Sequence, residues 1–133
     1  METIIKYEVP CMVCIKVANL RKKYDKEIDL KKWMKDEKNL YVGRHGRIFI
    51  DGEIFHYNGS KWCNPYKVNK GKNIEKRKYT LDESLKLYRE HVMKNLYNDL
   101  GELSGKVLGC FCSEKDPCHA KVLIELFKEK SEI

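Results

Sequence analysis

The stretch that decides the fold is Val107–His119, which reads VLGCFCSEKDPCH. Its first six residues form a short apolar run, which predicts a buried strand. Asp116 is a good N-cap residue and Pro117 fits the first helical position, so a helix is predicted to open at Cys118 and His119. A strand that leads through a short loop into a capped helix is typical of α/β folds.

Reactive side chains gather at this junction, where Cys110, Cys112, Glu114, Cys118 and His119 lie close together in the sequence. Unpaired N–H groups and the positive end of the helix dipole favour a thiolate or a bound anion at a helix N-terminus. Ligands of open α/β sheets bind at the carboxyl ends of the strands, where this loop is predicted to lie. We therefore place the candidate site here.

Two further elements are predicted on either side of this stretch. Apolar residues at helical spacing give the last helix a buried stripe, formed by Ala120, Leu123, Ile124 and Phe127. A capping box at Thr80–Glu83 opens a long helix that Gly101 ends, with a stripe of Leu85, Tyr88, Val92 and Leu96. Residues 68–78 are rich in lysine and lack apolar periodicity, which predicts an exposed loop.

A β-hairpin is predicted upstream, with strands Arg47–Ile50 and Glu53–Tyr57 around an Asp-Gly turn. Period-two patterns predict strands at Ile4–Val9 and Met12–Leu20, and Asp29 caps a helix after them. We predict a small three-layer or two-layer Rossmann-like α/β sandwich with a β-hairpin insertion. It forms a single domain over residues 1–133, in which residues 1–16 add a strand region with a Cys-x2-Cys pair.

The charge balance favours an anionic partner. Lys and Arg number 27 against 20 Asp and Glu, a net charge of +7, which suits a nucleotide-like or phosphate-bearing small molecule, or nucleic acid. Charges of both signs are mixed along the chain, so lysines that only solvate the surface are an equal alternative.

The amino terminus lacks both a basic segment and an uninterrupted apolar run, which excludes a signal peptide and a membrane anchor. We expect a cytoplasmic protein. Six cysteines in such a protein are free thiols, metal ligands or redox groups rather than disulfides.

An ordered set of motifs resembles the family called domain of unknown function 4326. The motifs lie between Val17 and Phe127: Tyr41-Val42-Gly43-Arg44, Ser60-Lys61-Trp62-Cys63-Asn64-Pro65-Tyr66, Tyr88-Arg89, Gly105–Cys112 and Cys118-His119. The family occurs in bacteria, phages and large DNA viruses, so a phage or viral origin, and hence a host-cell location, fits the resemblance. It implies no assigned activity.

Three positions depart from this family, namely Cys63, Phe111 and Ala120, where a small residue, Trp and Gly are usual. Cys11 and Cys14 precede the matching region, so a metal role for them would be peculiar to this chain. Residues Cys112–His119 are also similar, over a short stretch, to another family, domain of unknown function 488.

The first hypothesis is a pocket that binds a nucleotide, nucleoside or sugar phosphate, to process it or to sequester it. Arg44 and Lys61 would supply positive charge, Trp62 or Tyr66 would stack on a base, and Asn64 would read its edge, with Ser60 and Cys112 beside them. The catalytic candidates are Glu114, Cys118 and His119, for a transferase or hydrolase. Structural roles compete with these: Trp62 as a core anchor, Asn64 as a turn former and Arg44 as an ion-pair partner.

The second hypothesis is a zinc-stabilised module that binds nucleic acid. Cys11 and Cys14 would supply two ligands, and two of Cys110, Cys112, Cys118 and His119 would complete the shell. Buried structural cysteines are an equal alternative.

A third hypothesis makes Cys118 a nucleophile or redox group. Its thiolate would be stabilised by the helix terminus and by protonated His119 or nearby lysines. Because adjacent helical residues point about 100° apart, these two side chains need not form a hydrogen bond.

Overall fold

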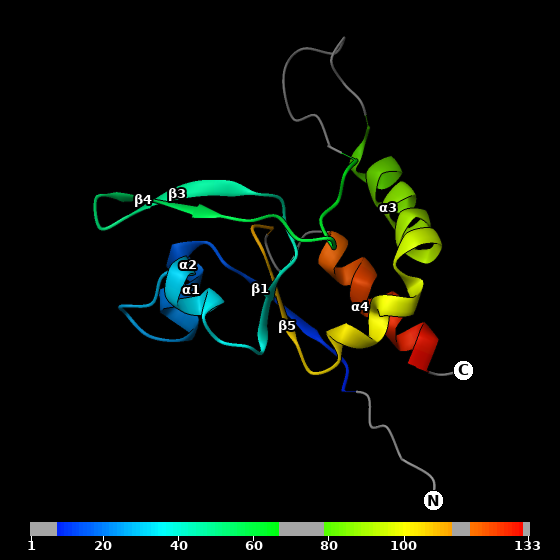
Figure 1. Ribbon diagram of the computed structural model, residues 1–133, viewed down its shortest axis with the longest axis horizontal. Coiled ribbons are helices and arrows are strands. Elements are labelled where there is room, and N and C mark those ends of the chain that lie inside the picture. The colour runs from blue at the N-terminus through cyan, green and yellow to red at the C-terminus, as the bar shows by residue number, and fades with distance from the viewer. Residues whose placement is uncertain (1–7, 67–78, 113–117, 132–133) are drawn as a thin grey trace, which may run out of the picture.

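A parallel three-stranded sheet forms the centre of the protein (Figure 1). The computed structural model describes residues 8–66, 79–112 and 118–131. Strand β5 (Val107–Cys110) lies between β1 (Cys11–Cys14) and β2 (Asn39–Tyr41) and runs parallel to both. The carboxyl ends of all these strands therefore meet at one edge, and the α/β prediction is confirmed.

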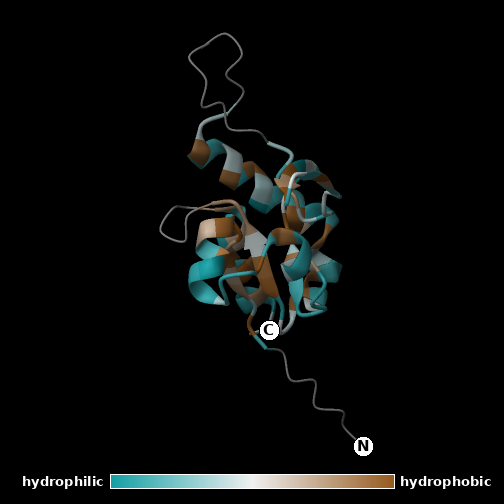
Figure 2. Ribbon diagram, turned by 90° about the vertical axis from the view of Figure 1, so that its left-hand side faces the viewer, coloured by the Kyte–Doolittle hydropathy of each residue, from teal (hydrophilic) through white to brown (hydrophobic). Residues whose placement is uncertain are grey.

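Helices cover both faces of this sheet (Figure 1), and the central strands are coloured as hydrophobic in Figure 2. One face carries α1 (Val17–Lys23) and α2 (Leu30–Met34), which close the Trp33 cluster of Val13, Ile15, Leu20, Leu30 and Trp33. The other face carries α3 (Leu81–Asn95), the 3-10 helix η2 (Tyr97–Leu103) and α4 (His119–Ser131). These close the Tyr88 cluster, which includes Tyr88, Val92, Leu100, Leu108, Cys110, Cys118, Ala120, Leu123 and Phe127.

A separate antiparallel hairpin joins β3 (Gly46–Ile50) to β4 (Glu53–Tyr57). Its turn residues have positive φ angles, 51° at Asp51 and 80° at Gly52, as a type I′ turn requires. Side chains on its inner face, including those of Ile48 and Phe55, pack against the Trp33 cluster. The predicted hairpin insertion is confirmed.

Helix caps follow the sequence signals. The side chain of Asp29 accepts a hydrogen bond of 2.9 Å from the Lys32 backbone N–H, and Thr80 with Glu83 forms the predicted capping box. The long helix ends earlier than predicted, at Asn95, and the chain continues as η2.

The strand predicted at Met12–Leu20 is wrong in its second half, because α1 begins at Val17. The Ile15 N–H still bonds to the neighbouring strand, at the Cys110 carbonyl (2.9 Å). Beyond it, the Lys16 carbonyl accepts from Leu20 (3.0 Å), so the backbone is satisfied by a helix that buries Leu20 completely.

Three sequence predictions concern residues outside the described ranges. These are most of the Ile4–Val9 strand, the lysine-rich loop, and the Asp116-Pro117 helix start. Among the helices that the structure describes, none has the length and apolar character needed to cross a bilayer.

Candidate functional site

Three cysteines meet where β5 ends and α4 begins. The sulfur atoms of Cys110, Cys112 and Cys118 all lie within 4.8 Å of one another, and we call them the three-cysteine cluster. Cys110 Sγ and Cys118 Sγ are 3.3 Å apart. The Cys118 carbonyl accepts the first helical hydrogen bond, from the Lys121 N–H at 3.0 Å. The junction thus brings strand end, helix start and cysteines together at the carboxyl edge of the sheet.

Most of the cluster is closed to water. Cys110 is 1% exposed and Cys118 is 2% exposed, whereas Cys112 is half-buried. The backbone N–H groups of Cys112 and Ala120 form hydrogen bonds with Cys110 Sγ and Cys118 Sγ respectively. Such donors stabilise negative charge on sulfur, and a cysteine that binds a cation does so as a negatively charged thiolate.

The pKa values of two thiols of the cluster, Cys110 and Cys118, are raised. Hydrogen bonds with the Cys112 and Cys118 side chains, which favour the protonated Cys110 thiol, together with burial, raise the pKa of Cys110. Contact with Cys110 lowers the pKa of Cys118, but contact with Cys112 and burial outweigh this effect and raise that pKa to about 11. A free Cys118 thiolate at neutral pH, which the nucleophile hypothesis needs, is therefore disfavoured unless a cation offsets its charge.

His119 lies beside the cluster with one ring nitrogen engaged. Its Nε2 is 2.6 Å from the Val42 carbonyl oxygen. A carbonyl can only accept, so Nε2 carries the proton and Nδ1 keeps a lone pair, 3.7 Å from Cys118 Sγ. Burial lowers the pKa of the imidazole, which favours this neutral form, and the Tyr88 ring packs edge-on against it at 5.4 Å.

The zinc hypothesis expects both Cys11 and Cys14 at this cluster, but the structure does not bring both of them there. Both residues lie in β1, where side chains three positions apart point to opposite faces of the sheet. Cys11 is exposed and pairs with Val107, at the far end of β5 from Cys110. Cys14 is buried, and its sulfur accepts a hydrogen bond from the Asn19 amide at 3.2 Å.

Arg44 and Lys61, the two residues predicted to supply positive charge to a ligand, lie in different surroundings. Arg44 is exposed, donates through Nε to the Asn64 carbonyl at 2.9 Å, and its charge contributes to the lowered pKa of His119. The Lys61 ammonium instead pairs with Asp99 (3.2 Å) and Glu102 (2.8 Å) of η2. Of these two residues, Arg44 is therefore the one whose charge acts on His119, beside the cluster.

Trp62 and its neighbours hold a loop against α3. Trp62 is 2% exposed, so its indole offers no open face for a base, and its carbonyl accepts from the buried Tyr88 hydroxyl at 2.6 Å. Ser60 Oγ accepts from the Trp62 N–H at 3.1 Å.

Asn64 is also engaged within the protein, because its amide donates to Ser84 Oγ and its Oδ1 accepts from the Tyr66 N–H, both at 2.9 Å. The Tyr66 carbonyl accepts in turn from the Ser84 hydroxyl, and the Tyr66 ring packs edge-on against Tyr79 and His91. Glu114 lies outside the described residues.

Sequence reasoning missed two groups that organise this region. Ser84 is a fully buried serine one turn before Tyr88 on the inner face of α3, so a small polar residue in an apolar stripe was the available signal. The Val42 carbonyl is a backbone group, so the residue type does not reveal its role. The fold shows that it faces His119.

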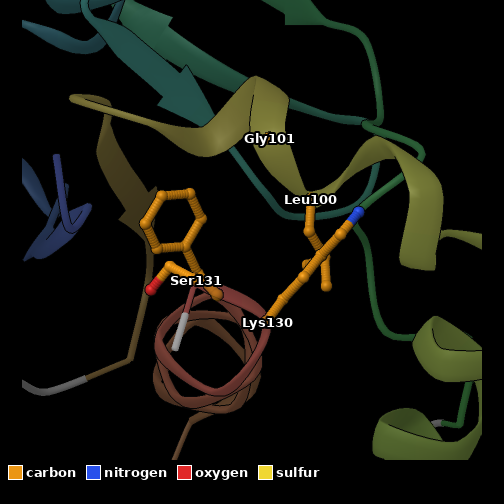
Figure 3. Close-up of a pocket in the computed structure, with 5 residues that line it drawn as sticks. Leu100, Gly101, Lys130 and Ser131 are labelled. Atoms are coloured by element: carbon orange, nitrogen blue, oxygen red, sulfur yellow. The ribbon is translucent and has the colours of Figure 1, made fainter. Parts of the chain in front are cut away.

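A surface hollow lies elsewhere, between η2 and the end of α4 (Figure 3). Leu100, Gly101, Phe127, Lys130 and Ser131 line it. The Lys130 ammonium donates to the Tyr97 carbonyl at 2.8 Å, so the one charged group of this lining is already engaged. The hollow has no part in the cysteine site.

Comparison with known proteins identifies the family. The family model described as Domain of unknown function (DUF4326) matches residues 26–129. The chain belongs to this family. The match includes Arg44, the loop with Trp62, and the three-cysteine cluster, but leaves out Cys11 and Cys14. No curated protein and no solved structure matches the chain. The likeness to family 488 stays a prediction.

Proposed function

We propose that this DUF4326 protein is a zinc-binding α/β domain whose ion is held by the three-cysteine cluster. The observation that carries the proposal is the convergence of three sulfurs within 4.8 Å, with one pair at 3.3 Å. Zinc–sulfur bonds of about 2.3 Å put the sulfurs of one tetrahedral site about 3.8 Å apart. The cluster thus needs only small side-chain shifts to bind an ion, and thiolates favour zinc over the hard cations.

We assign the fourth ligand to His119 through Nδ1, whose ring has to turn toward the ion because its nitrogens lie outside the group that the three sulfurs form. The Nδ1 atom is 3.7 Å from Cys118 Sγ, close to the separation of about 3.5 Å expected between a sulfur and a nitrogen that share one tetrahedral zinc ion. The hydrogen bond from Nε2 to the Val42 carbonyl is the outer contact that usually fixes the tautomer of a metal-bound histidine. Three cysteines and one histidine make a closed site, which suits a structural rather than a catalytic ion.

Metal content tests this function directly. Protein purified without added metal and analysed by mass spectrometry for metals is expected to hold about one zinc per chain, as one four-ligand site requires. Cys112→Ser and Cys118→Ser should lose the zinc, and His119→Gln should bind it more weakly in competition with a chelator. Cys11→Ser and Cys63→Ser are the matched controls. Substoichiometric zinc after incubation with excess ion, or equal loss in Cys11→Ser, contradicts the proposal.

A nucleotide, nucleoside or sugar phosphate that binds near this site, whether processed or sequestered, is the second candidate function. The observation in its favour is the exposed Arg44, whose charge reaches His119. Calorimetric titration with nucleoside mono- and diphosphates should show binding that Arg44→Ala weakens about tenfold, the loss of one charge-assisted hydrogen bond. Arg21→Ala is the control, and equal binding by both variants contradicts this candidate.

A further inference from the structure

The outer face of the β3–β4 hairpin presents an apolar pair beside a basic pair. Arg47 lies opposite His56, and Phe49 lies opposite Ile54, all on the face turned away from the Trp33 cluster. Phe49 is 73% exposed, the highest value for any large hydrophobic residue in the described ranges, and Ile54 is 48% exposed. The hairpin extends away from the three-stranded sheet, so this face is open to solvent (Figure 1).

Anchoring of the hairpin does not require these exposed side chains. The opposite face already carries the anchoring residues, among them Ile48, Phe55 and Tyr57, which pack against the Trp33 cluster. A strand needs only one apolar face to stay attached to a core, and the other is usually polar. On the second face, Phe49 and Ile54 pair across the strands as a contiguous exposed apolar patch, which is the kind of feature that marks an interaction surface.

Arg47 differs from the other arginines that the structure describes. Arg21 and Arg44 donate to backbone carbonyls, and Arg89 pairs with Glu129 at 2.6 Å. Within the described ranges, Arg47 has neither a hydrogen-bond nor an ion-pair partner. Its guanidinium therefore keeps its donors available for an anion.

Within the described hairpin, no acidic side chain lies on this face. Asp51 lies in the turn. Glu53 directly precedes Ile54 in β4, so its side chain belongs to the inner face. Arg47 and Phe49 are two residues apart on the same face, a separation of about 7 Å along the strand. One nucleotide can thus place its base on the ring and its phosphate at the guanidinium.

We propose that this outer face binds single-stranded nucleic acid. A base stacks on Phe49 and contacts Ile54, a backbone phosphate binds Arg47, and His56 lies beside the same strand of nucleic acid. The net charge of +7 draws a polyanion toward the protein. This surface is separate from the three-cysteine cluster, and the proposal does not depend on the zinc site.

Charge argues against the other occupant of such a face, a second copy of this chain. A two-fold contact through the outer face would bring together two copies that each carry a net charge of +7, with the Arg47 guanidinium of both in one interface, and like charges in an interface cost free energy. A polyanion instead neutralises the same group.

Fluorescence anisotropy with short labelled oligodeoxythymidylate and oligouridylate tests the proposal. Phe49→Leu keeps an apolar side chain but removes stacking, and we expect it to weaken binding about 5- to 150-fold. Phe49→Trp should bind at least as well as the unsubstituted protein. Arg47→Ala should lower the slope of log K against log salt by about 0.7, the loss of one phosphate contact. Tyr24→Leu, a change at a ring 43% exposed at the end of α1, is the matched control.

Circular dichroism and zinc content of each variant separate a binding effect from a folding effect or from failure of the metal site. Weaker binding by Phe49→Leu but not by Tyr24→Leu, with DNA or RNA, supports the proposal. Equal affinity of Phe49→Leu and the unsubstituted protein overturns it. Loss of self-association in the hairpin variants, with unchanged oligonucleotide binding, overturns it in favour of a dimer surface.

Discussion

Chelation of zinc is expected to lower the melting temperature of this protein by about 10–25 °C. A ligand present at a thousand times its dissociation constant stabilises the folded state by about 4 kcal/mol. One kcal/mol shifts the melting temperature of a domain of this size by about 3–6 °C. The effect is large because the proposed ion links the central strand β5 to α4, whose Leu123 and Phe127 lie in the Tyr88 cluster.

Differential scanning calorimetry with and without a strong chelator measures this effect. Cys118→Ser should melt near the temperature of the chelated protein and should not respond further to chelator. Cys11→Ser should respond as the unsubstituted protein does, because Cys11 lies at the opposite end of β1 from the cluster. A chelated protein that has lost its zinc but melts at an unchanged temperature would show that the ion does not stabilise the fold.

Local signals in the sequence predicted the local structure well. The Asp51-Gly52 turn, the Asp29 cap and the Thr80–Glu83 capping box are each set by contacts within a few residues, and each is confirmed. The convergence of Cys110 with Cys118 follows from a strand that ends where a helix begins, so it could also be predicted.

Contacts between distant segments could not be predicted in the same way. Cys11-x2-Cys14 has the spacing of a zinc ligand pair, but this spacing brings sulfurs together in a turn and separates them on a strand. The sequence around Lys61 does not show that its ammonium group pairs with Asp99 and Glu102, because the fold of η2 brings these distant residues beside it. The sheet order β1-β5-β2, which places the last strand in the middle, depends on packing rather than on any local motif.

The placement of β5 also depends on a glycine next to the cluster. Gly109→Ala is expected to destabilise the protein by about 3 kcal/mol, the upper end of the usual cost of overpacking a core. A Cβ atom at this position would lie 2.3 Å from Trp33 Cη2 and 2.8 Å from Ile15 Cγ2. The backbone cannot move away, since Gly109 pairs with Val13 in β1 and with Tyr41 in β2. Urea unfolding measures the loss.

A double-mutant cycle separates this clash from the other effects of adding a methyl group. Trp33→Leu alone should also destabilise the protein, by about 2–5 kcal/mol, because it leaves a cavity in a cluster where Trp33 is 1% exposed. In the double variant the alanine methyl group enters that cavity. The double variant should therefore lose about 1–3 kcal/mol less free energy of unfolding than the two single variants lose together. Strict additivity would mean that β5 can shift to accommodate the methyl group. Because Cys110 follows Gly109 directly, such a shift would also move the first sulfur of the cluster, and the zinc content of Gly109→Ala would fall with it.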